Sequence, residues 1–140
     1  MSLRIGYAPG CWDLLHDGHL NLLEHAKDLV DILVVGVVSD AGAEAYKRRP
    51  IQSQDTRLRV VRALRVVDKA LMQETTDPSP VLRQLLPHVL FHGDDWSALL
   101  EGNETLAELG IEFVLLPYTP GISTSQLLAY LERGEAVTRC

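Results

Sequence analysis

The sequence predicts an α/β protein with a Rossmann-like, three-layer fold around a five-stranded parallel sheet. Short runs rich in Val, Ile and Leu alternate with helix-like stretches along the 140 residues, and strands separated by helices favour a parallel sheet with right-handed crossovers. Unusual polar clusters follow several of the expected strands, where ligands bind in such folds. From the length we expect one domain over residues 1–140.

Five strands and five helices are expected in alternation. The strands are the apolar runs Leu3–Ala8, Ile32–Val38, Lys69–Met72, Val89–His92 and Ile111–Leu116. The helices are the stretches Gly18–Leu29, Asp55–Leu64, Pro80–Leu86, Thr105–Leu109 and Ser125–Glu132. Asp55 is the expected N-cap of the second helix, and Ser123 or Thr124 that of the last.

Composition limits the classes of function. Apolar residues make up 46% and charged residues 23%, which is typical of globular proteins. The net charge of −6 argues against broad nucleic-acid binding. No apolar run approaches the roughly 20 residues of a membrane span, the first residues lack a signal-peptide pattern, and two cysteines make no disulfide framework. We therefore expect a cytoplasmic, reduced protein with no membrane partner.

The first polar cluster is Gly10-Cys11-Trp12-Asp13 followed by His16-Asp17-Gly18-His19. It lies between an expected strand and an expected helix, where free backbone N–H groups and the positive helix end attract an anion. Both histidines would meet a phosphate held there, and Asp13 or Asp17 could orient an imidazole. Alternatively, Asp17 caps the helix, or the histidines ligate a metal.

The second cluster, Tyr46-Lys47-Arg48-Arg49-Pro50, follows the second strand, and Arg57 and Arg65 come after it. Arginine binds phosphate through a planar, bidentate fork. Arg57 and Arg65 lie within roughly 80° of one helix face, so both reach one anion only if Arg65 is at or beyond the helix end. Arg59 and Arg62 are expected on a solvated face.

Two more clusters follow later strands. In His92-Gly93-Asp94-Asp95-Trp96, the glycine allows a sharp turn, and a carboxylate beyond it can bind a ribose hydroxyl, a base amine or a metal. The segment Thr119–Ser125 offers hydroxyls and N–H groups at a helix start, which indicate either a second anion site or a plain helix cap.

Taken together, the motifs Gly-Cys-Trp-Asp-Leu-Leu-His-Asp-Gly-His, Gly-Asp-Asp-Trp and Gly-Ile-Ser-Thr-Ser resemble the cytidylyltransferase family of H-x-G-H nucleotidyltransferases, and within it most the glycerol-3-phosphate cytidylyltransferases. The similarity runs from Ile5 to about Leu131, with the motifs in the same order.

The resemblance implies roles for individual residues. His16 and His19 would stabilise the transition state, together with Arg65. Nucleotide binding falls to residues of three segments: Gly10, Cys11, Trp12, Asp13 and Gly18; Arg48 and Asp94; and Gly121, Ile122, Ser123, Thr124 and Ser125. Acceptor binding is expected from Lys47, Arg57 and Asp40. No metal ligand is assigned to the protein, and Mg²⁺ would arrive with the nucleotide.

The chain departs from the family pattern on the acceptor side and at one phosphate contact. Tyr118 stands where the family has an arginine. Tyr46 is near the position of a substrate-binding lysine, which Lys47 could replace after a shift of one residue. The stretch Glu74–Ser79 lacks the lysine that the glycerol phosphate enzymes offer their acceptor.

The expected reaction is transfer of CMP from CTP to a small phosphorylated alcohol, with glycerol 3-phosphate as the first candidate, in a homodimer by resemblance. Ethanolamine-phosphate or phosphonate cytidylyltransferases remain alternatives. An adenylyltransferase acting on sugar phosphates or flavin precursors is another, since Arg49-Pro50-Ile51 is similar to those enzymes. A catalytically weak nucleotide-binding module is an alternative of a different class, prompted by Tyr118.

Overall fold

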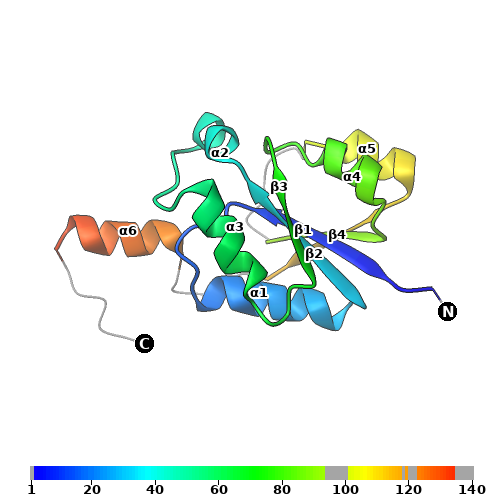
Figure 1. The fold of residues 1–140 in the computed structure, drawn as a ribbon, viewed down its shortest axis with the longest axis horizontal. Coiled ribbons are helices and arrows are strands. Elements are labelled where there is room, and N and C mark those ends of the chain that lie inside the picture. Colours follow the sequence, from blue (N-terminus) through cyan, green and yellow to red (C-terminus); the bar gives the residue numbers. More distant parts are fainter. Residues whose placement is uncertain (1, 94–100, 118, 120–122, 135–140) are drawn as a thin grey trace.

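The chain forms a five-stranded parallel sheet in the order β3-β2-β1-β4-β5 (Figure 1). This computed structural model describes residues 2–93, 101–117, 119 and 123–134. The strands are β1 (Ile5–Gly10), β2 (Ile32–Val38), β3 (Lys69–Gln73), β4 (Val89–Gly93) and β5 (Glu112–Leu116). The register of β1 on β2 runs from Ile5 opposite Ile32 to Gly10 opposite Val37.

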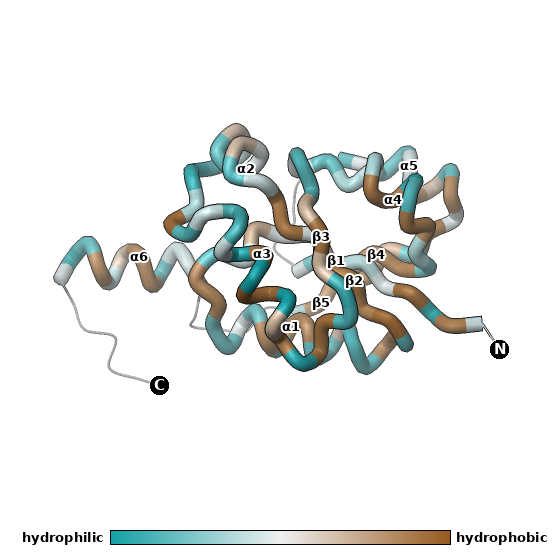
Figure 2. The backbone as a smooth tube through the Cα atoms, in the orientation of Figure 1, coloured by the Kyte–Doolittle hydropathy of each residue, from teal (hydrophilic) through white to brown (hydrophobic). Residues whose placement is uncertain are grey.

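Helices cover both faces of the sheet and complete the three-layer fold. They are α1 (Asp17–Asp28), α2 (Asp40–Tyr46), α3 (Gln54–Arg62), α4 (Ser79–Leu85), α5 (Asn103–Leu109) and α6 (Thr124–Glu132). One apolar cluster joins the sheet to α1 and α3, and a second joins its other face to α4 and α5. The central strands are accordingly apolar, whereas the outer helices alternate between polar and apolar residues (Figure 2). None of the helices in the described ranges is long and apolar enough to cross a membrane.

The predicted elements are all present, and one helix was missed. The strand Ile32–Val38 agrees residue for residue, and the other bounds differ by one or two residues at most ends. The helix α2 was not predicted because its short sequence, rich in Ala and Gly, has no apolar periodicity. The hydroxyl of Ser39 nevertheless caps it by accepting from the Gly42 N–H.

Two predicted caps also need correction. Ser53, not Asp55, is the N-cap of α3, because its hydroxyl accepts from the Thr56 N–H while Asp55 lies inside the first turn. Asp17 does not cap α1, because the imidazole of His16 does. The prediction of Ser123 as the N-cap of α6 is confirmed.

The strand order reverses between β1 and β4, which creates a topological switch point at their carboxyl ends. The chain leaves β2 and β3 on one side of β1, and β4 and β5 on the other. Loops from both halves of the sheet therefore diverge at this point and leave room for a ligand. Three polar clusters of the sequence begin beside this switch point, namely those that start at Gly10, His92 and Thr119.

We predict that Gly36→Ala destabilises the protein by about 3 kcal/mol, because a Cβ on this strand residue would overlap the hydroxyl of buried Tyr7. That hydroxyl donates to Gln73 Oε1 at 2.6 Å, so the ring cannot move without losing a buried hydrogen bond. Urea unfolding measures the effect. The matched control is Gly110→Ala, where the left-handed backbone is strained but the space is open; it should cost about 1 kcal/mol. Equal losses in the two variants would contradict this packing.

Candidate active site

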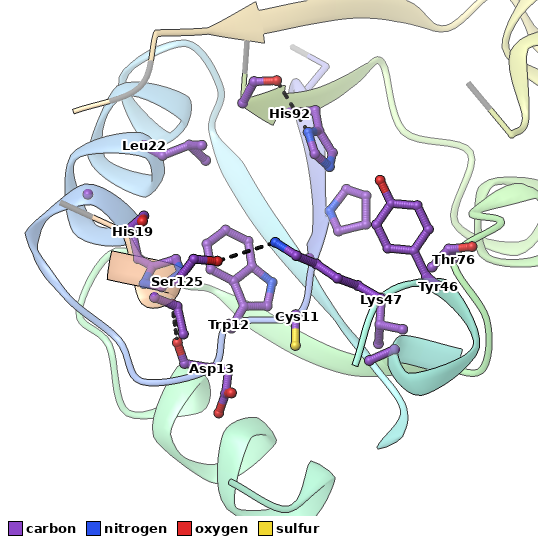
Figure 3. Close-up of a pocket in the computed structure, with 18 of the residues that line it drawn as sticks. Cys11, Trp12, Asp13, His19, Leu22, Tyr46, Lys47, Thr76, His92 and Ser125 are labelled. Carbon is purple, nitrogen blue, oxygen red and sulfur yellow. Dashed lines mark hydrogen bonds between the residues drawn. The ribbon is translucent and has the colours of Figure 1, made fainter. Parts of the chain in front are cut away.

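A pocket of about 620 Å³ opens at the switch point (Figure 3). Its walls come from the ends of β1, β2, β3 and β4, from the starts of α1 and α6, and from the α2–α3 loop. Of the predicted site residues, the lining includes Gly10, Cys11, Trp12, Asp13, His16, Gly18, His19, Lys47, Arg48, Ser123, Thr124 and Ser125. The volume falls within the range of pockets for small molecules.

His16 and His19 form the N-terminal cap of α1. The Gly18 N–H donates to Nδ1 of His16 at 3.0 Å, and the His16 N–H donates to Nδ1 of His19 at 3.2 Å. These two bonds make a reciprocal capping box in which imidazoles replace the usual hydroxyl and carboxylate. Their ring centroids are 4.0 Å apart. The spacing of the two histidines thus follows from the geometry of a helix start.

The caps determine the protonation of both rings. Because each Nδ1 accepts from a backbone N–H, it carries a lone pair, and the proton of the neutral ring is on Nε2. Burial lowers the pKa of His16. Burial, and then the neighbouring His16, lower the pKa of His19 to about 4. At neutral pH the pair therefore presents two uncharged Nε2–H donors to a ligand.

The β1–α1 loop is strained on either side of Asp13. Trp12 and Leu14 both have left-handed backbones, with φ of 57° and 50°, a conformation that is unfavourable for residues with a side chain. Asp13 is 2% exposed, and its carboxylate accepts from the backbone N–H groups of Ile51 and Gln52 at 2.8 and 3.0 Å. The carboxylate therefore holds the loop in place, and its two oxygens already have protein partners.

Trp12 fixes the same loop to the sheet. Its Nε1 donates to the carbonyl of Gly36 at 3.0 Å, and the centroids of its ring and the His19 ring are 5.4 Å apart. The indole is 5% exposed and forms part of the pocket floor. Half-buried Cys11 lies beside it, and burial raises the pKa of its thiol.

Arg57 and Asp40, both expected to bind the acceptor, do not line the pocket. Arg57 is fully buried, and its guanidinium donates to the carbonyls of Cys11 and Val38, both at 2.7 Å. It also donates to the carbonyl of Gln52, and to the Asp40 carboxylate at 2.8 Å. The guanidinium holds the pKa of Asp40 below its usual range. In this arrangement Arg57 joins the ends of β1 and β2 to α3, and each of its three side-chain nitrogens donates to a protein oxygen.

Arg65, predicted to be catalytic beside the histidines, is not brought to the pocket either. The helix α3 ends at Arg62, and Arg65 is an exposed residue of the turn that follows. Arg65 thus lies beyond the helix end, which was the condition for both arginines to reach one anion, but neither Arg57 nor Arg65 lines the pocket.

Positive charge reaches the pocket from the α2–α3 loop. Lys47 crosses the pocket in Figure 3, and its Nζ lies 3.3 Å from the Ser125 hydroxyl at the start of α6. Arg48 lies 3.3 Å from the Asp13 carboxylate, with its side chain 35% exposed. Lys47 therefore faces the start of α6, and both cations border the same cavity as the two histidines.

The start of α6 is attached to the loop that carries Asp13. The hydroxyl of Thr124 donates to the Asp13 carbonyl at 2.8 Å, and Ser123 caps the helix by accepting from the Gln126 N–H. Asn21 of α1 donates to the hydroxyl of Thr119, which lies between β5 and α6, at 2.9 Å. The predicted residues Asp94, Gly121 and Ile122, and also Tyr118, lie outside the residues that the structure describes.

The sequence reasoning did not single out several residues that line the pocket. Gln73 is the last residue of β3 and Thr76 follows it, so their position at the end of a strand could have identified them. Glu101 lies shortly before α5, far from the end of β4, and belongs to no recognised motif. Tyr46 was noted only in place of a lysine. These four residues form the pocket wall on the β3 side.

A protein metal centre is not built from the described residues, among which no three His, Cys, Asp or Glu side chains come together as ligands. The two Nδ1 atoms are occupied by helix caps, and both Asp13 oxygens accept from backbone N–H groups.

The chain is similar to several known proteins. Residues 7–129 match the family model described as cytidylyltransferase-like. The bifunctional protein HldE of Rhodopseudomonas palustris is 38% identical over 138 residues, which is 96% of this chain but 28% of that protein. This chain thus spans about 28% of the length of such curated relatives.

Two solved structures share the fold. The lipopolysaccharide core biosynthesis protein of Thermoplasma volcanium superposes with a TM-score of 0.71 at 26% identity, covering 84% of this chain and 98% of that one. Pantoate-beta-alanine ligase of Francisella tularensis has a TM-score of 0.61 at 14% identity, covering 99% and 72%. The second likeness shows the fold alone.

Replacing Arg57 tests its structural role. We predict that Arg57→Met lowers the free energy of unfolding by about 3 kcal/mol, because it leaves Asp40 and two strand-end carbonyls without their donor. The control Arg65→Met, at an exposed position, should stay within about 0.5 kcal/mol of the wild type. Chemical denaturation measures both. If Arg57→Met were as stable as the control, Arg57 would not hold these loops together.

The buried histidine predicts a specific pH dependence of stability. The folded state favours neutral His19, so this stabilisation is fully present above the ordinary histidine pKa of 6.5 and is lost as the pH falls through about 4. The control variant His19→Asn keeps an acceptor oxygen for the His16 N–H but does not titrate. Between pH 6.5 and 4, the free energy of unfolding should fall more steeply in the wild type than in His19→Asn. Parallel curves would show that His19 titrates normally.

Proposed function

This chain belongs to the cytidylyltransferase-like family and is a nucleotidyltransferase, and we propose that it transfers a nucleoside monophosphate to a small phosphorylated sugar or polyol. The donor is a nucleoside triphosphate, and pyrophosphate is the second product. The observation that carries the proposal is a pair of histidines that line the pocket at the switch point and whose Nδ1 atoms are both used in capping α1, which leaves Nε2–H as the donor of each neutral ring.

In the proposed reaction, an oxygen of the acceptor phosphate attacks the α-phosphorus of the triphosphate. A new P–O bond forms as the bond from the α-phosphorus to the β-phosphate oxygen breaks, and its electron pair leaves with pyrophosphate. The acceptor phosphate is already an anion near neutral pH, so no proton has to be removed. Catalysis then consists of positioning and charge stabilisation.

The polar groups around the pocket would each interact with the phosphates in this reaction. His16 and His19 would donate to phosphate oxygens that gain charge in the transition state. Lys47, beside Ser125 at the start of α6, would attract the triphosphate together with the N–H groups of that helix. Arg48 would neutralise a further phosphate oxygen. Bound Mg²⁺ would add charge neutralisation on the phosphates.

The similar proteins change the proposed acceptor from the one that the sequence motifs suggested. Glycerol 3-phosphate remains a candidate, but the match to a lipopolysaccharide core biosynthesis protein favours a sugar phosphate. CTP is the proposed donor, from the resemblance of the Gly-Asp-Asp-Trp and Gly-Ile-Ser-Thr-Ser motifs. ATP is the second candidate, favoured by Arg49-Pro50-Ile51. A single domain, a homodimer and a cytoplasmic location stay predictions.

A panel assay tests the proposed function. Pyrophosphate release is measured for CTP and ATP with glycerol 3-phosphate, phosphoethanolamine, heptose 1-phosphate and a hydroxyalkylphosphonate, in the presence of Mg²⁺. We expect one donor to be clearly preferred and a sugar or polyol phosphate to be the best acceptor. Nucleotide binding without pyrophosphate release across the panel would instead support a binding module.

Replacing either histidine tests the catalytic pair. We predict that His16→Gln and His19→Gln each lower kcat by about 10²–10³, because each loses a donor that acts in the transition state. His25→Gln, the same change at an exposed position of the same helix outside the pocket lining, is the control and should keep kcat within about threefold, since surface changes are usually small. Retention of more than a tenth of the wild-type kcat in both histidine variants would contradict the assignment.

A further inference from the structure

We propose that Glu101, held by Thr76, sets the acceptor specificity of this pocket by accepting hydrogen bonds from acceptor hydroxyls and repelling a second anionic group. The inference rests on the proposed nucleotidyl transfer and names the part of the site that would contact the body of the acceptor. Neither residue belongs to a motif of the sequence.

The charges of the pocket are divided between its two sides. Among the described lining residues, the Lys and Arg side chains are Lys47 and Arg48, and Lys47 points to the start of α6. The β3 side is lined by Tyr46, Gln73, Thr76 and Glu101 and carries a carboxylate but no such cation. Figure 3 shows Tyr46 and Thr76 near each other, on the opposite side of the pocket from His19 and Ser125.

The carboxylate of Glu101 is held in a defined position. Thr76 Oγ1 lies 3.0 and 3.1 Å from its two oxygens. The next residue, Gly102, has a left-handed backbone with φ of 92°, and a Cβ on it would come within 3.1 Å of the Pro78 ring. One turn later, Thr105 donates to the Ser79 hydroxyl at 2.8 Å. The chain before α5 is thus packed against the β3–α4 connection.

A second hollow of about 350 Å³ adjoins the pocket at the same residues. It shares Tyr46, Thr76 and Glu101 with the main pocket, and its remaining lining is Ala41, Gly42, Ala45, Glu74 and Thr75. This lining includes two carboxylates, those of Glu74 and Glu101, and no Lys, Arg or His among the described residues. An acceptor longer than glycerol phosphate could extend past Glu101 into this space.

These features favour a hydroxyl-rich acceptor with one phosphate. A carboxylate accepts hydrogen bonds from sugar hydroxyls, and the hydroxyls of Thr and Tyr both accept and donate. A site built for hydroxyls discriminates against analogues that lack them. A second phosphate or a carboxylate on the acceptor would face Glu101 and Glu74, and the described residues that line the second hollow include no cation to pair with it. Ethanolamine phosphate would leave the second hollow empty, although its ammonium could approach Glu101.

The test compares acceptors and variants by steady-state kinetics. The acceptors are a hexose or heptose 1-phosphate, the corresponding bisphosphate, and phosphoethanolamine. The variants are Glu101→Gln, Glu101→Lys and Thr76→Val. The control is Glu104→Gln, an exposed glutamate of α5 that lines neither hollow. Because Glu101 is exposed, its substitutions should leave the fold intact.

We expect the wild type to prefer the sugar monophosphate over both other acceptors. Glu101→Gln should raise the KM for the sugar phosphate about tenfold, the effect of losing a hydrogen bond to a charged group, with little change in the KM for the nucleotide. Thr76→Val should act in the same direction, and Glu101→Lys should raise kcat/KM for the bisphosphate. Glu104→Gln should behave as the wild type.

Two results would overturn the inference while leaving the proposed function in place. One is an unchanged preference among acceptors in Glu101→Gln and Glu101→Lys, and the other is a wild type that prefers phosphoethanolamine. If the wild type released no pyrophosphate with any acceptor, the proposed function itself would fail, and this inference with it.

Discussion

The site depends on the attachment of the strained β1–α1 loop to the segment that follows α2. Trp12 and Leu14 adopt left-handed backbones that are unfavourable for residues with side chains. The loop keeps this shape because Arg57 binds the Cys11 carbonyl from one side and the Asp13 carboxylate binds the N–H groups of Ile51 and Gln52 from the other. Strain of this kind persists only where surrounding contacts hold it.

The same loop places His16 and His19 at the start of α1. The hydrogen bonds that cap this helix are also the ones that determine which ring nitrogen of each histidine carries the proton. Capping α1 requires an acceptor on each ring, and supplying that acceptor from Nδ1 leaves the proton on Nε2. A cap made of serine and glutamate would stabilise the helix equally well but would offer the ligand no N–H donor. The tautomers needed for phosphate binding therefore follow from the fold of the helix start.

Sequence patterns predicted the sheet well, because five apolar runs separated by helices allow few other arrangements. They also placed His16, His19 and Ser125 on one pocket, since each follows a strand at the same edge of the sheet. They failed for Arg57, because helical spacing says nothing of the carbonyls that surround a buried guanidinium. Glu101 gave no signal, because its position depends on how the chain before α5 packs against the β3–α4 connection, which a linear pattern does not contain.

The histidine tautomers are the central claim, and nitrogen NMR of the imidazole rings tests them most directly. Long-range ¹H–¹⁵N spectra at pH 7 would be recorded with and without a nucleoside triphosphate. We predict that both rings are neutral with the proton on Nε2, and that nucleotide shifts their Nε2 signals. The signals of His88, whose Nδ1 accepts from the Ile5 N–H outside the pocket, should not move. A charged ring, an Nδ1–H tautomer, or signals of His16 and His19 that do not respond to the nucleotide would show that the two histidines are not the phosphate donors of this site.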